Sequence, residues 1–273
     1  MANDKVKQML DAGVHFGHLT RKWNPAMAPY IFMERNGIHI IDLYKTHAKL
    51  DIAGEAMAKI AASGRKIMYV ATKKQAKEIV AKNAETANMP YITERWPGGM
   101  LTNFVTIRKA VKKMTAIDKM KVDGTFNTLS KRERLQVDRQ RAKLEKNLGS
   151  IADMSRLPGA LFIVDIKREH IAVAEAKKLG IPTFGIVDTN SNPEIVDFAI
   201  PANDDASKSI NTILSYVVGA VNTGLVERKA DKDEQAAAQK EQKEQKAEKK
   251  ASEAKAEKAP VAEKPAKEEK AAE

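Results

Sequence analysis

The chain has no cysteine, and aromatic residues make up only 5% of it. The lack of cysteine excludes disulfides, thiolate nucleophiles and cysteine metal ligands, and it suits a reducing compartment. The motifs G-x-G-x-x-G, G-x-x-x-x-G-K-[ST], G-x-S-x-G and H-E-x-x-H are also absent, so the usual signatures of nucleotide binding, serine hydrolysis and zinc proteolysis are missing. No apolar run approaches the roughly 18 residues of a membrane span, and the first ten residues lack a signal-peptide core. We therefore expect a cytoplasmic protein without a membrane partner.

The sequence does carry an excess of positive charge, and that excess is unevenly placed. The net charge is +11, and all of it belongs to residues 1–226, because residues 227–273 contain 13 Lys or Arg and 13 Asp or Glu. Residues 104–150 alone hold 13 Lys or Arg against 5 Asp or Glu. A basic folded body favours a polyanionic partner such as a nucleic acid.

Apolar segments predict strands buried on both faces of a sheet at Ile67 to Ala71, Ala160 to Val164, Pro182 to Val187 and Phe198 to Ile200. Helical segments alternate with them, at about residues 46–62, 74–87, 170–179 and 205–222. This alternation is typical of α/β proteins. We predict a Rossmann-like or flavodoxin-like, doubly wound and mainly parallel sheet, preceded by a helix over about residues 4–12 and a strand from Ile38 to Leu43.

Residues 104–150 break the alternation, since they contain no plausible strand. Apolar side chains recur there in two helical stripes on either side of a turn signal at Gly124, namely Ile107, Val111 and Met114, then Val137, Leu144 and Leu148. We predict an inserted α-helical coiled-coil hairpin at 104–150, within a discontinuous α/β body of residues 1–103 and 151–226. Residues 227–273 form a low-complexity Lys/Glu/Ala tail that we expect to be disordered, with transient helix and breaks at Pro260 and Pro265.

The hairpin is the first candidate binding surface. A long arm with little core of its own is suited to follow a ribose-phosphate backbone, since each cation that displaces a phosphate counterion adds affinity. The alternative is a solvated charged face, but acidic partners for helical pairing are scarce here, which favours RNA. The predicted contacts are Arg108, Lys109, Lys112, Lys113, Lys131, Arg132 and Arg134.

A second candidate lies near the N-terminus, where histidines, aromatics and cations are interleaved. Such side chains stack on bases and meet phosphates in irregular RNA. The predicted contacts are His15, Phe16, Gly17, His18, Arg21, Lys22, Trp23 and Asn24. A metal site is the rival, but Gly17 disfavours the helix that would align the two histidines, and no nearby carboxylate or thiol completes the set. A partly buried histidine is the third alternative, and we assign no metal ligand.

A third candidate precedes the hairpin and combines a stacking side chain with a Gly-Gly turn. Its predicted contact residues are Arg95, Trp96, Gly98, Gly99, Thr102 and Asn103. A tight structural turn is an equally good interpretation of the same residues. Thr102 or Asn103 is also placed to cap the first helix of the hairpin.

Catalytic interpretations have less support. Thr72-Lys73-Lys74 follows a buried strand where doubly wound enzymes bind phosphate, but the loop has no glycine to wrap a nucleotide. Asp165 and Asp188 end two strands, where an aspartate is more often a cap or turn former than a catalytic acid. Whether Asp188 with Asp204 and Asp205 holds a structural hard cation stays open. We predict no catalytic residue, no cofactor and no small-molecule substrate.

Several long motifs resemble one family: AGVHFGHLTRKWNPAMAPYIF, HIIDLYKT, RWPGGMLTNF and ALFIVDIKREHIAVAEAKKLGIPTFGIVDTNSNPEIVDFAIPANDDA. Together with the basic hairpin they resemble the bacterial small-ribosomal-subunit protein two family, in order, from about Val6 to Val221. The resemblance implies a structural ribosomal protein bound to small-subunit ribosomal RNA between head and body. It also implies docking of ribosomal protein one and no catalytic role.

Two other functions stay open at this point. One is an α/β enzyme that uses a nucleotide or phosphosugar, against which the missing glycine-rich loop argues. The other is a free RNA-binding regulator, which would sediment apart from ribosomal particles. The expected location is cytoplasmic and ribosome-bound.

Overall fold

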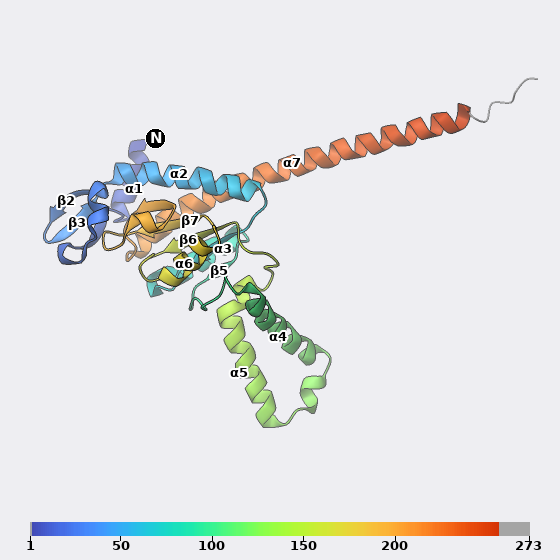
Figure 1. Cartoon of the computed structure of the whole chain (residues 1–273), viewed down its shortest axis with the longest axis horizontal. Coiled ribbons are helices and arrows are strands. Elements are labelled where there is room, and N and C mark those ends of the chain that lie inside the picture. Colours follow the sequence, from blue (N-terminus) through green and yellow to red (C-terminus); the bar gives the residue numbers. More distant parts are fainter. Residues whose placement is uncertain (1, 257–273) are drawn as a thin grey trace, which may run out of the picture. The chain divides into compact units, whose positions relative to one another are not determined.

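The computed structural model describes the backbone of residues 2–256 and the side chains of residues 4–232 (Figure 1). A five-stranded sheet has the order β5-β4-β6-β7-β8, and each neighbouring pair is parallel. Its strands are β4 (Ile67–Val70), β5 (Tyr91–Ile92), β6 (Ala160–Val164), β7 (Thr183–Val187) and β8 (Phe198–Pro201). This is the flavodoxin-like strand order, with the switch point between β4 and β6. The predicted fold class is confirmed.

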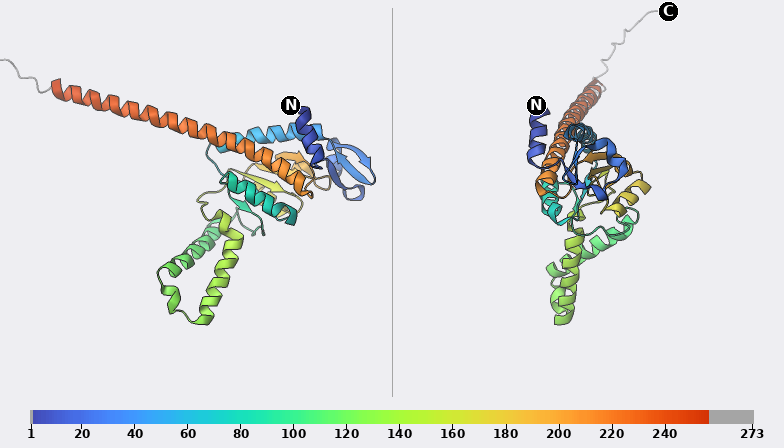
Figure 2. Two further views of the ribbon diagram at one scale, coloured as in Figure 1. Left: turned by 180° about the vertical axis from the view of Figure 1, so that it is seen from behind. Right: turned by 90° about the vertical axis from the view of Figure 1, so that its left-hand side faces the viewer.

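Each strand of this sheet sends successive side chains into two separate hydrophobic clusters, as the pleat requires. In β4, Ile67 and Tyr69 enter one cluster, while Met68 and Val70 enter the other. The first cluster is covered by α1 (Ala2–Asp11), α2 (Leu43–Ala62), α3 (Lys74–Thr86) and the start of α7 (Ser207–Ala256), two of which, α3 and α7, are seen in Figure 2. The second is covered by α6 (His170–Lys178) and by irregular segments around residues 93–103 and 148–154.

A second, antiparallel sheet has the order β1-β3-β2 and consists of β1 (Phe16–Leu19), β3 (Ile38–Ile41) and β2 (Ile31–Arg35). Only β3 was predicted, and it ends earlier than expected. The Asp42 side chain accepts a hydrogen bond from the Tyr44 backbone N–H at 3.0 Å, so α2 begins at Leu43 rather than near residue 46. The strand β5 was missed because it has only two residues, and β1 and β2 were missed because they lack a regular alternation of apolar residues.

The predicted helical hairpin is present as α4 (Phe104–Val122) and α5 (Lys131–Leu148) (Figure 1). Gly124 turns the chain with φ of +75°, and η3 (Thr125–Thr128) widens the tip. Ser130 and Glu133 then form a capping box at the start of α5. The hairpin belongs to the compact unit Met1–Arg228. Its separation from the body as a domain of residues 104–150 stays a prediction.

The C-terminal helix is longer than predicted. Instead of ending near residue 222, α7 continues to Ala256, and its part from Lys229 belongs to a second unit, Lys229–Glu273. Between Leu225 and Ala259 the sequence has no proline or glycine and is rich in Ala, Glu and Lys, which favour helix. The structure therefore has helix over residues 227–256, where disorder was expected. Residues 257–273, with Pro260 and Pro265, lie outside the described residues.

One helical segment, Ser207–Lys232, has the length and hydropathy of a membrane-crossing helix, whereas the sequence analysis found no such run. Several of its apolar side chains are buried in the first hydrophobic cluster, with Ile213, Leu214 and Val217 fully inaccessible. Buried core helices of soluble proteins often have the same length and hydropathy, so this segment is only weak evidence that the chain crosses a membrane.

Candidate RNA and partner interface

The cations predicted to bind RNA lie on the outside of the hairpin. Six of the seven are exposed, and Arg134 is half-buried. Among the side chains that the structure describes, none of the seven forms an ion pair. Two make a hydrogen bond to backbone: Arg108 donates to the carbonyl of Ser155 at 3.2 Å, and Arg134 donates to that of Leu129 at 3.0 Å. Their charges are therefore not neutralised within the described part of the chain.

Other cations of the hairpin are used differently. Lys121 pairs with Asp138 at 2.7 Å across the two helices, and Arg141 pairs with Asp118 across the helices and with Glu145 along α5. These contacts join α4 to α5 next to the buried side chains of Met114 and Ile117. The hairpin thus contains cations that hold its helices together and others that have no acidic partner.

The N-terminal candidate segment presents part of its predicted set to solvent. Phe16 is 48% exposed and Trp23 is 40% exposed, and Arg21 and Lys22 between them are exposed as well. The His15 ring packs on Phe16 with centroids 4.0 Å apart. These side chains are accessible from solvent, and their contact with RNA stays a prediction.

Asn24 and Gly17 have internal roles instead. The Asn24 side chain accepts a hydrogen bond from Ala26 N–H at 2.9 Å and caps η2 (Pro25–Tyr30). The backbone N–H of Asn24 donates to the Thr189 carbonyl at 2.8 Å. A Cβ at Gly17 would meet the Thr189 side chain at 2.5 Å, so only glycine allows this close approach. Both residues anchor the N-terminal segment to the loop after β7.

Three further apolar side chains that the sequence analysis did not single out are exposed, two in β2 and one in α2. Phe32 is 70% exposed, Met33 is 49% exposed and Tyr44, in the first turn of α2, is 68% exposed. Contiguous patches of exposed apolar side chains often mark interaction sites, whereas single exposed apolar residues are common on protein surfaces. No signal in the sequence marks these side chains as exposed, because Phe32 and Met33 continue the apolar run that begins at Tyr30.

The third candidate segment requires a correction, because Trp96 is only 5% exposed and lies in the second hydrophobic cluster. Its indole N–H donates to a carboxylate oxygen of Glu175 at 3.2 Å. The ring is therefore not available for stacking on a base. Glu175 also accepts hydrogen bonds from the backbone N–H groups of Gly99 at 2.8 Å, Leu101 at 2.9 Å and Thr102 at 3.1 Å.

Glu175 is a buried carboxylate on α6 that the sequence analysis did not single out, and only 8% of the residue is exposed. Burial acts to raise its pKa, but the hydrogen bonds from Thr102, Leu101, Trp96 and Gly99 outweigh burial and lower the pKa below its usual value. The carboxylate thus fixes the turn that leads into α4. A glutamate in the middle of an amphipathic helix gives no signal of this role in the sequence.

The other members of that segment are placed as follows. Arg95 and Gly98 are exposed, and Gly99 has φ of +81°, a conformation that glycine adopts without strain. Asn103 occupies the N-cap of α4, but its side chain makes no capping bond to the backbone and instead accepts from the Thr106 hydroxyl at 2.8 Å. The segment is mainly a structural turn with a polar, exposed rim.

The crevice at the switch point, where related folds bind phosphate, is filled by the chain's own charges. The Lys73 ammonium lies 2.7 Å from oxygens of both Asp204 and Asp205 and 3.1 Å from Asp165. Burial acts to lower the Lys73 pKa, but these carboxylates outweigh it and raise the pKa. The pKa of Asp204 is raised to about 7 by burial and by the neighbouring charges of Asp188 and Asp165. Carboxylates at this position repel a phosphate rather than bind it.

His18 joins the same group of charges. Its Nδ1 lies 3.1 Å from Asp188, and its Nε2 lies 3.4 Å from Asp205. The hydrogen bond with Asp188 raises the His18 pKa against the opposing effect of burial. This corrects two expectations: the ring is flanked by acids rather than free to stack, and carboxylates distant in sequence do lie near it.

The structure is thus a doubly wound α/β body with internal ion pairs in its switch-point crevice and an inserted basic hairpin. A model of the family Ribosomal protein S2 matches residues 9–224. The small ribosomal subunit protein uS2 of Flavobacterium johnsoniae is 75% identical over 238 residues, which cover 87% of this chain and 94% of the relative. The protein of the same name from Christiangramia forsetii is 72% identical over 246 residues, covering 90% and 82%. That from Bacteroides fragilis is 66% identical over 238 residues, covering 87% and 86%.

The chain therefore belongs to the ribosomal protein S2 family. Proteins of this family are structural constituents of the small ribosomal subunit and are not enzymes. The resemblance seen in the sequence is confirmed.

Proposed function

We propose that this chain acts in the small ribosomal subunit by binding small-subunit ribosomal RNA between head and body, with its basic hairpin as the main phosphate-binding element. The observation that carries the proposal is that seven cations of α4 and α5 lack acidic partners among the described side chains. Unpaired exposed cations on one arm gain most from a phosphate-rich partner, because each contact releases counterions. Phosphate contacts would position the protein, and the shape of folded RNA would specify the site.

The small sheet suits a different neighbour. Phe16, Trp23, Phe32 and Tyr44 present large aromatic side chains to solvent. Aromatic side chains are enriched at protein interfaces. We therefore extend the proposal to a protein partner at this surface, with ribosomal protein one as the candidate and a cytoplasmic, ribosome-bound location for the complex. Replacing Phe32 by Ser would reduce capture of ribosomal protein one by assembled subunits while leaving RNA binding intact; equal capture would argue against this surface.

The RNA proposal is tested by removing charge from the hairpin without changing its helices. Replacement of Arg108, Lys109, Lys112 and Lys113 by Gln should reduce incorporation into small subunits and flatten its salt dependence, so that the difference from the wild type is largest at low salt. The matched control replaces four exposed, unpaired lysines elsewhere, namely Lys49, Lys59, Lys82 and Lys178. Both variants lose the same net charge, so equal incorporation of the two at every salt concentration would refute the role of the hairpin.

The same sedimentation experiment tests the alternative of a free regulator. A structural constituent is found almost entirely with ribosomal particles, whereas a regulator is found mainly at the top of the gradient. A nucleotide-binding function is disfavoured by the carboxylates around Lys73. Addition of ATP or a phosphosugar should accordingly give no thermal stabilisation.

A further inference from the structure

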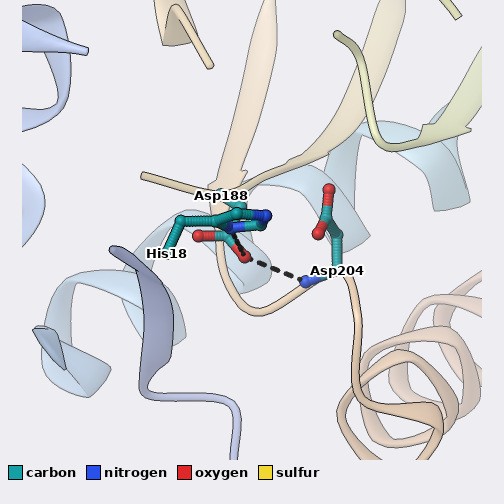
Figure 3. A group of neighbouring side chains, drawn as sticks. All are labelled: His18, Asp188 and Asp204. Atoms are coloured by element: carbon teal, nitrogen blue, oxygen red, sulfur yellow. Dashed lines mark hydrogen bonds and ion pairs between the residues drawn. The ribbon is translucent and has the colours of Figure 1, made fainter. Parts of the chain in front are cut away.

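Three side chains from distant parts of the chain converge beside the switch-point crevice (Figure 3). One nitrogen of His18, in β1, and one carboxylate oxygen from each of Asp188 and Asp204 all lie within 4.8 Å of one another. Asp188 follows β7 and is 1% exposed, and Asp204 follows β8 and is fully buried. We propose that His18, Asp188 and Asp204 form a binding site for a divalent transition-metal ion, with Zn²⁺ as the best-suited ion.

The observation that points to a ligand is an unsatisfied oxygen. Asp204 uses Oδ1 to bind Lys73 at 2.7 Å, while its Oδ2 is buried and has no hydrogen-bond partner among the described residues. Burial of a carboxylate oxygen without a partner costs free energy. Such an oxygen therefore suggests a bound ligand that completes its interactions. A cation bound to His18 and Asp188 would supply that partner.

The existing distances fit metal coordination with small shifts. Ligand atoms about 2.1 Å from a tetrahedral zinc ion lie roughly 3.4 Å from each other. The His18 Nδ1 to Asp188 Oδ2 distance is already 3.1 Å. Zn²⁺ accepts one imidazole and two carboxylates, whereas Mg²⁺ prefers oxygen ligands alone and keeps its waters. The imidazole therefore favours zinc over magnesium.

The surroundings also match those of a bound metal. If Nδ1 of His18 binds the ion, Nε2 is left 3.4 Å from Asp205 Oδ2, and carboxylates commonly lie beside the second nitrogen of a metal-bound histidine. Four aspartates, Asp165, Asp188, Asp204 and Asp205, face only one lysine in this cluster. A divalent cation would reduce the imbalance.

The ion would join β1, in the small sheet, to the ends of β7 and β8, which pair with each other but not with β1. His18 already lies close to the loop after β7, because its N–H donates to the Thr189 hydroxyl at 2.8 Å. A metal bond to Asp188 and Asp204 would hold the small sheet against the carboxyl ends of β7 and β8. The role is structural, and it is separate from the charge of the hairpin.

The test uses the full chain without an affinity tag, treated with a chelator and dialysed. Titration with Zn²⁺ should show one tight site per chain, and Co²⁺ in its place should give a visible absorption band typical of nitrogen and oxygen ligands. His18→Ala and Asp204→Asn should each weaken Zn²⁺ binding at least tenfold and abolish the Co²⁺ band. Mg²⁺ should compete poorly.

Exposed residues provide the controls: His170→Ala and Asp153→Asn remove the same ligand types elsewhere and should leave Zn²⁺ affinity and the Co²⁺ band unchanged. Circular dichroism checks that each variant is folded, and Asp204→Asn keeps the shape of the side chain if His18→Ala does not fold. The proposal is overturned if the wild-type chain gives no Co²⁺ band. It is also overturned if His18→Ala and Asp204→Asn bind Zn²⁺ like the wild type, or if Mg²⁺ binds as tightly as Zn²⁺.

Discussion

The switch-point crevice and the hairpin use the same kind of side chain in opposite ways. In the crevice, Lys73 lies among three aspartates and its charge is balanced within the protein. On the hairpin, Lys112 and Lys113 are exposed and have no acidic neighbour within 4 Å among the described side chains. The comparison teaches that a lysine count alone does not identify a binding surface, because the fold pairs some lysines with its own carboxylates and leaves others unpaired.

The largest effect expected from this comparison follows removal of the crevice lysine. Lys73→Met leaves Asp165 and the buried Asp204 without their cation, and breaking a buried pair in this way costs about 3 kcal/mol or more in the free energy of unfolding. Lys112→Met on the hairpin should change it by less than about 0.5 kcal/mol. Urea unfolding in chelating buffer measures both. Similar losses in the two variants would erase the distinction between paired and unpaired lysines.

A second prediction concerns the carboxylate that holds the turn before the hairpin. Glu175→Ala leaves the backbone N–H groups of Gly99 and Leu101 and the indole of Trp96 without an acceptor, which should cost about 2–3 kcal/mol of stability. The folded-state pKa of Glu175 lies below the unfolded value of 4.5. The contribution of the Glu175 carboxylate to the free energy of unfolding is therefore complete above pH 4.5 and is lost as the pH falls through the folded-state pKa.

Unfolding measured between pH 7 and pH 3 checks the sign of this effect. The wild type should lose more stability than Glu175→Gln as the solution is acidified, because the Gln side chain does not titrate. Parallel curves for the two proteins would show that the carboxylate does not act as the structure indicates. Glu194→Gln, which alters an exposed glutamate, serves as the control.

The smallest effect is expected at the capping box of α5. Ser130→Ala removes the hydroxyl that accepts a hydrogen bond from Glu133 N–H. The loss of such a cap lowers the stability of the helix by about 1 kcal/mol. The change should appear as faster hydrogen exchange in the first turn of α5, with global stability and RNA affinity nearly unchanged. A large loss of RNA affinity would mean that the shape of the tip, and not the charge of the arm, dominates binding.

The parallel sheet could be predicted from the sequence because its strands are short apolar runs between helices; β6, for example, has the predicted bounds Ala160–Val164. The hairpin was equally visible, since two apolar stripes flank Gly124. The small sheet was largely missed, because β1 and β2 are held by pairing with β3 and by Gly17 lying against Thr189. Such contacts depend on residues far away in the chain.

Long-range contacts also explain which site residues were placed wrongly. Trp96 looked like a stacking side chain, but its burial depends on Glu175, which lies 79 residues away in sequence. His18 looked isolated from acids, but the ends of β7 and β8 bring Asp188 and Asp204 to it. Local composition predicts which residues are able to bind RNA, while the fold decides which of them stay available.

The most direct test of the account is the salt dependence of binding to a small-subunit ribosomal RNA fragment. The slope of log K against log salt concentration should be shallower by about 3 for the variant with Gln at Arg108, Lys109, Lys112 and Lys113, since each phosphate contact contributes roughly 0.7–0.9. The variant with Gln at Lys49, Lys59, Lys82 and Lys178 should keep the wild-type slope. Equal slopes for all three proteins, or an equal decrease in both variants, would contradict the claim that unpaired hairpin cations bind the RNA.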